Sequence, residues 1–185
     1  MTKVTGYTLA GVATSALVGA CLGLLGNLAL PTAPARAGVV AALIVAGIGL
    51  FRETSFPGIP LPQIRRQTPG IWAKRWPGAV APVMWGLDLG LIFTTWLTFS
   101  GAWLLAALAI LSGSAGFGAR LFVAFWLGTA LSVWIGPALL PSARATPDLM
   151  DAIAGQHRLF RRSHAAGLVV AMVLLAWIYA ESMSL

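Results

Sequence analysis

A long apolar run extends from Ala79 to Gly113, and Asp88 is its only charged residue. A straight helix over that run would be roughly 50 Å long, whereas the hydrocarbon core of a bilayer is about 30 Å thick. The run is therefore too long for one straight membrane span and too apolar for the surface of a soluble domain. It predicts either one interrupted crossing or a tight hairpin that crosses twice.

The composition of the chain supports a membrane protein. Hydrophobic residues make up 58% of it and charged residues 9%, whereas soluble domains carry about 25% charged residues. We therefore predict an all-α integral membrane protein, a polytopic bundle of five transmembrane helices with six as the alternative. The net charge of +7 lies in short segments between apolar runs, a pattern typical of membrane orientation and anionic-lipid contact rather than nucleic acid binding.

The remaining apolar runs complete a single transmembrane domain over residues 1–185. The expected spans are residues 5–30, 37–51, 79–113, 119–140 and 165–180. The sequence "APARA" before Gly38 fits an A-x-A cleavage pattern, but the apolar run before it is long and continues past Cys21. We therefore expect the first span to be retained.

The charges in two connecting segments, 52–78 and 141–164, distinguish the topologies. Basic residues outnumber acids in both, and basic loops stay on the cytoplasmic side of a membrane. The two segments share one side only if the run 79–113 crosses once. The charges thus predict a break within 94–101, a cytoplasmic N-terminus and an outward C-terminus in a prokaryotic cell membrane.

The carboxylate of Asp88 requires an explanation inside an apolar run. At a bilayer centre it costs about 2.5–3.5 kcal/mol on insertion scales. In one interpretation Asp88, Thr94 and Thr95 form a polar cleft for a proton or ion. In the other, which we favour, Asp88 lies near the cytoplasmic interface and bonds a neighbouring helix or a loop arginine. Arg120 is a less suitable partner because it is expected near the opposite face.

Aromatic and basic residues in "RRQTPGIWAKRWPG" and "HRLFRRSH" predict anchoring at the lipid headgroups. The predicted anchoring residues are Arg65, Arg66, Trp72, Lys74, Arg75, Trp76, Arg158, Arg161 and Arg162. Small-xxx-small pairs predict close helix packing within the chain: Gly19 with Gly23, and Gly86 with Gly90.

Three stretches between residues 65 and 140 share a rhythm of small residues: "RRQTPGIWAKRWPG", "WGLDLGLIFTTW" and "SGSAGFGARLFVAFWLGTAL". They resemble the second half of the transmembrane thiol-reductant carriers of the cytochrome c biogenesis and DsbD type. The resemblance implies a shared scaffold with a broken span. It does not imply redox activity, because Thr94 and Thr95 stand at the break and Cys21 is the only cysteine, so the monomer cannot exchange a dithiol.

These features favour a non-catalytic accessory or assembly subunit of a larger membrane complex. The alternatives are a small carrier that moves a proton, ion or small solute past Asp88, and a degenerate relative of the thiol-redox carriers. An enzyme is disfavoured because the sequence shows no Ser/His/Asp set, metal cluster or phosphate loop. The sequence indicates no cofactor. The binding of chlorophyll, quinone or haem by neighbouring chains stays an open alternative. The expected partners are the bilayer, anionic lipids and other membrane subunits.

Overall fold

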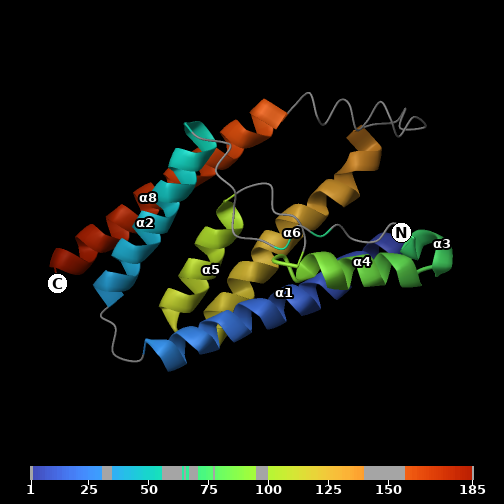
Figure 1. Ribbon diagram of the computed structural model, residues 1–185, viewed down its shortest axis with the longest axis horizontal. Coiled ribbons are helices and arrows are strands. Elements are labelled where there is room, and N and C mark those ends of the chain that lie inside the picture. Colours follow the sequence, from blue (N-terminus) through green and yellow to red (C-terminus); the bar gives the residue numbers. More distant parts are fainter. Residues whose placement is uncertain are drawn as a thin grey trace.

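The computed structural model describes residues 2–30, 35–55, 64, 66, 71–76, 78–94, 100–139 and 157–184 (Figure 1). The regular structure of these residues is helical. The helices are α1 (Thr2–Ala29), α2 (Ala35–Thr54), α3 (Trp72–Arg75), α4 (Val80–Gly90), α5 (Gly101–Ser112), α6 (Ala115–Leu139) and α8 (His157–Ser184). The predicted all-α class is confirmed for the described part of the chain.

Within the described residues, four helices are long and apolar enough to cross a membrane. These candidate spans are Thr2–Ala29, Ala37–Thr54, Ala115–Ile135 and Arg161–Glu181. Helices α4 and α5 are shorter, and the 12 residues of α5 extend only about 18 Å. A fifth passage therefore depends on α4 and α5 acting together.

The apolar run 79–113 is divided in the structure. Helix α4 ends at Gly90 and α5 begins at Gly101, so the interruption begins earlier than the expected 94–101. Pro82 lies in the first turn of α4, where backbone N–H groups have no partner within the helix. Helix α5 ends at Ser112, and the next residue, Gly113, has a φ of 57°, a left-handed conformation that glycine adopts without strain.

Helices α4 and α5 run in the same direction along α1. Contacts proceed in order along α1, with Val83 against Gly6, Gly90 against Gly11 and Ile110 against Gly26. The positions from Gly6 to Gly26 span about 30 Å, which matches the hydrocarbon thickness of a bilayer. The interruption therefore lies between two helices that follow α1 in the same direction.

The other long helices alternate in direction. Helix α6 is antiparallel to α1, since Trp126 lies at Gly11 and Gly118 at Gly19. Helix α2 is antiparallel to α5, and α8 lies antiparallel beside α2 (Figure 1). As a result, α2 and α6 run toward the side of the molecule where Thr2 lies, whereas α1, α4 and α8 run away from it. We call that side the Thr2 end.

The last helix is longer than the sequence predicted. We expected a span over 165–180, whereas α8 runs continuously from His157 to Ser184. The sequence "HRLFRRSHAA" contains neither proline nor glycine, so nothing in it interrupts the helix. Arg161 and Arg162 therefore belong to the first turns of α8 and not to a loop.

Candidate functional site at the helix interruption

Two buried carboxylates flank the gap between α4 and α5. Asp88, near the end of α4, is 7% exposed, and Glu53, in the last turn of α2, is 3% exposed. A buried charge is costly unless it is paired and hydrogen-bonded. The hydrogen-bond and ion-pair partners of these two acids therefore determine which role the interrupted region can have.

Asp88 is paired with an arginine from the basic segment that precedes α4. Its Oδ1 accepts a hydrogen bond from Nη2 of Arg66, whose side chain is 44% exposed. Nε of Arg66 also donates to the carbonyl oxygen of Thr94, at 3.3 Å. Thr94 Oγ1 in turn donates to the backbone oxygen of Asp88, at 3.1 Å. One guanidinium thus ties the end of α4 to the chain that leaves it.

The remaining candidates for this site lie elsewhere. Arg120 is exposed and its Nε donates to the carbonyl of Gly116, at 3.1 Å. Thr95 lies outside the described residues. Of the partners considered from the sequence, the structure therefore brings Arg66 and Thr94 to Asp88.

The final carbonyls of α4 are hydrogen-bonded, although this helix ends inside the protein. The N–H of Leu91 donates to Asp88 and that of Ile92 to Leu89, at 3.3 and 3.0 Å. Ser15 of α1 is fully buried and its Oγ donates to the carbonyl of Gly90, at 3.0 Å. A helix can end within an apolar region only when its free carbonyls find such partners.

The start of α5 is bound by the second carboxylate. Glu53 Oε1 lies 3.0 Å from the backbone nitrogen of Ser100 and 3.0 Å from its Oγ, and 2.7 Å from Nη1 of Arg52. A negative charge is stabilising at a helix N-terminus, where N–H groups are unpaired and the helix dipole is positive. Glu53 therefore caps α5 from a different helix.

The interruption is also packed by apolar side chains. Ile92 is 4% exposed and has a φ of 59°, an uncommon conformation for a β-branched residue. Its neighbour Phe93 packs against Phe122 and Trp103, with ring centroids 6.2 and 5.2 Å away. The surrounding contacts hold this strained turn in place and connect the helices on either side of the interruption.

Glu53, Ser100 and Ser15 were missed by the sequence analysis. Glu53 directly follows Arg52 after the expected span 37–51, and the sequence analysis treated it only as the acid of the basic segment 52–78. A usable signal was its rarity, because the whole chain has only 5 acidic residues. Ser15 and Ser100 carry no local signal, since serine is common in apolar helices and at their starts.

The glycines expected at helix contacts lie between helices of one chain. A Cβ at Gly19 would clash with the backbone of Gly118 on α6, and a Cβ at Gly23 with the backbone of Ser114. Gly86 and Gly90 meet the backbone of α1 in the same way. These close approaches bring backbones together as small residues do in membrane helices.

The expected interface anchors divide into several groups. Trp72 and Trp76 stack with ring centroids 5.8 Å apart, beside exposed Arg75. On α8, Arg161 is partly buried and Arg162 is exposed. Arg65 lies outside the described residues, as do the side chains of Lys74 and Arg158. Arg66, also expected as an anchor, contacts Asp88.

The fold and site define an all-helical protein with several helices able to span a membrane, fastened around one interrupted helix. Among curated proteins, the chain is similar to proteins named methylamine utilization protein MauF. It is 33% identical to that of Methylorubrum extorquens over 168 residues, which cover 90% of this chain and 55% of the relative. It is 33% identical to that of Paracoccus versutus over 133 residues, which cover 71% of this chain and 48% of the relative.

A third relative, from Paracoccus denitrificans, is 28% identical over 125 residues, which cover 66% of this chain and 45% of the relative. The chain thus spans about half the length of the curated relatives it matches. No family model matches the chain, and no solved structure matches it.

The resemblance to the thiol-reductant carriers is wrong, because the relatives found are named MauF. The stretches that suggested it are rich in glycine and alanine. In the structure Gly86, Gly90 and Gly118 serve close contact between helices, a requirement that unrelated membrane bundles share. A regular spacing of small residues therefore indicates close helix packing and not common ancestry.

Proposed function

We propose that the chain is a multi-pass membrane protein that crosses the bilayer five times, with α4 and α5 forming one broken passage. The order of contacts from Gly6 to Gly26 supports a single passage there. The alternating directions of the helices that flank the two basic segments support a common side for both, and the positive charge favours the cytoplasm for that side. The C-terminus then lies on the outer side of a prokaryotic cell membrane.

We further propose that it acts in methylamine utilization as a non-catalytic accessory or assembly component of a membrane complex. The observation that carries this proposal is the similarity to MauF proteins across 90% of the chain. The site supports a scaffold, since Asp88 and Glu53 are engaged by Arg66 and Ser100 and hold helices together.

Deletion of the gene in its own host tests this role. We expect loss of growth on methylamine and unchanged growth on another nitrogen and carbon source. An affinity-tagged chain, extracted in mild detergent, should copurify with other proteins that the host makes only during growth on methylamine. Normal growth of the deletion strain on methylamine would contradict the proposal.

A carrier is the second candidate, and the interrupted helix is the observation that favours it. Broken membrane helices beside ionisable groups form the substrate and ion sites of many transporters. Purified chain in vesicles should then take up labelled methylammonium or conduct protons, and Asp88→Asn should abolish that flux. Vesicles without flux, together with the growth defect, would leave the accessory role.

A further inference from the structure

Two apolar pockets lie along helix α5, and we refer to them together as the groove. Its first part has a volume of about 430 Å³, and its lining includes Leu105, Phe125, Leu168 and Ala171, with Ser163 and His164 at one end. Pockets that bind small ligands have volumes of about 300–1,000 Å³. The first part of the groove alone is large enough for a ligand.

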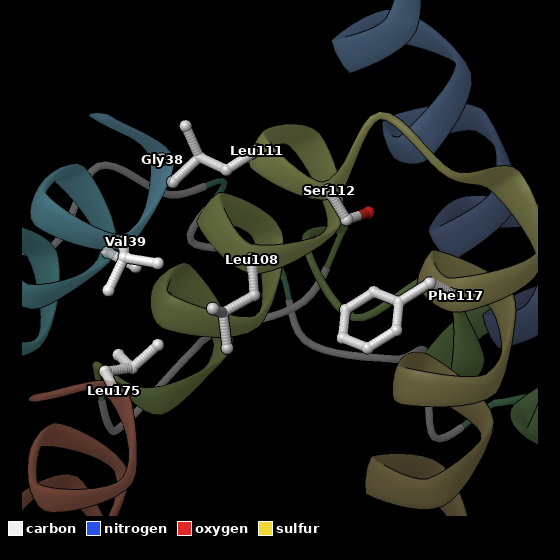
Figure 2. Close-up of a pocket in the computed structure, with 8 residues that line it drawn as sticks. Gly38, Val39, Leu108, Leu111, Ser112, Phe117 and Leu175 are labelled. Atoms are coloured by element: carbon white, nitrogen blue, oxygen red, sulfur yellow. The ribbon is translucent and has the colours of Figure 1, made fainter. Parts of the chain in front are cut away.

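The groove continues toward the other end of α5. A second pocket, of about 280 Å³, also has α2 in its wall, and its lining includes Gly38 and Val39 of α2, Leu108 and Leu111 of α5, Phe117 of α6 and Leu175 of α8 (Figure 2). The two pockets follow successive turns of α5, which is about 18 Å long, close to the 15 Å or so of one bilayer leaflet. The groove thus has the length of one acyl chain region, and its polar residues lie at the Thr2 end.

Two arginines of α8 lie next to the polar end of the groove, just before the lining residues Ser163 and His164. Arg161 is partly buried and Arg162 is exposed one turn before His164, and the first turn of α8 contains no acid. The N-terminus of a helix adds a partial positive charge. This end complements a phosphate group, and the groove that leads from it complements a hydrocarbon chain.

We propose that this groove binds one anionic phospholipid, with its phosphate at Arg161, Arg162 and His164 and an acyl chain along α5. A helix of a partner protein fits less well, since a segment as long as α5 and 10 Å wide occupies about 1,400 Å³, far more than either pocket. The inference rests on the membrane placement proposed above and not on the role in methylamine utilization.

Two glycines provide a matched pair of variants. Gly167 lines the first pocket, and a Cβ added there meets nothing within 4 Å. Gly167→Leu therefore adds a bulky side chain at the groove, and its Cβ displaces no protein atom. A Cβ at Gly128 on α6 is equally open, and Gly128 is absent from the lining of both pockets. Gly128→Leu is the control for a bulky side chain on a helix.

The test is native mass spectrometry of the full chain, delipidated in detergent and titrated with phosphatidylglycerol or phosphatidylcholine. We expect one phosphatidylglycerol to bind at least tenfold more tightly than phosphatidylcholine. Gly167→Leu should weaken that binding tenfold or more, and Gly128→Leu less than twofold. Arg161→Gln and Arg162→Gln should each reduce the preference for phosphatidylglycerol roughly fivefold and leave phosphatidylcholine binding unchanged.

Equal affinity for the two lipids would overturn the proposal, as would wild-type binding by folded Gly167→Leu. Copurification of a quinone in place of phospholipid would also overturn it. The arginine variants change only side chains at the helix surface, so they keep the test decisive if Gly167→Leu does not fold. Alkaline extraction of membranes separately checks the membrane placement, and the growth assay separately checks the accessory role.

Discussion

Glu53 at the end of α2 holds Ser100 at the start of α5, with Oε1 at 3.0 Å from both the backbone nitrogen and Oγ. These residues are 47 positions apart in the sequence. The contact joins α5 to α2, which is not part of the α4–α5 pair. It also gives the carboxylate of Glu53 a favourable position at a helix N-terminus.

Glu53→Ala should destabilise the protein strongly. The substitution leaves the buried N–H of Ser100 without its acceptor and removes charged hydrogen bonds worth about 1.5–3 kcal/mol each. We expect the free energy of unfolding in detergent to fall by at least about 3 kcal/mol, measured by chemical unfolding followed by tryptophan fluorescence. Glu181→Ala, at an exposed position near the end of α8, should change it by less than about 0.5 kcal/mol. Equal effects of the two variants would exclude a capping role for Glu53.

The pair of Asp88 and Arg66 should respond asymmetrically to substitution. Arg66→Ala leaves a buried carboxylate without its partner and should cost about 3 kcal/mol, the lower end for broken buried pairs, because Arg66 is 44% exposed. Asp88→Asn should cost less, since the freed guanidinium can turn toward solvent. The double variant should be more stable than Arg66→Ala alone. Thermal unfolding of all three, with Arg75→Ala as an exposed control, measures this, and additive losses would contradict the pairing.

The contact of α1 with α6 requires glycine at position 19. A Cβ there would meet the backbone carbonyl of Gly118, and overpacking of this kind costs about 1–3 kcal/mol. We expect Gly19→Ala to lower the unfolding temperature. Gly128→Ala on the open face of α6 should be neutral or slightly stabilising, because alanine favours a helix by about 0.5–1 kcal/mol. Similar unfolding temperatures for both variants would show that α1 and α6 do not approach so closely.

Much of the fold could be predicted from the sequence. The position of each apolar run, and the number of residues needed to cross a bilayer, can both be read along the chain. The interruption follows too, since a helix over 79–113 would be too long for one crossing. Its position at Gly90 does not follow. That position depends on the bond from Ser15, which is 75 residues away, and on Arg66 from a segment with no apolar pattern. Glu53 was missed for the same reason, because its burial depends on how α2 packs against α5.

The final prediction concerns the two basic segments. In a Cys21→Ser background, single cysteines at positions 55 and 142 should react with a membrane-impermeant maleimide only after the membrane is opened, since we place both positions in the cytoplasm. A cysteine at Gly116, where an added Cβ meets nothing within 4 Å, lies at the opposite end and should react in intact cells. Labelling of positions 55 and 142 from opposite sides would mean that α4 and α5 cross the membrane separately. The carboxylate of Asp88 would then belong to a hairpin and not to a broken passage.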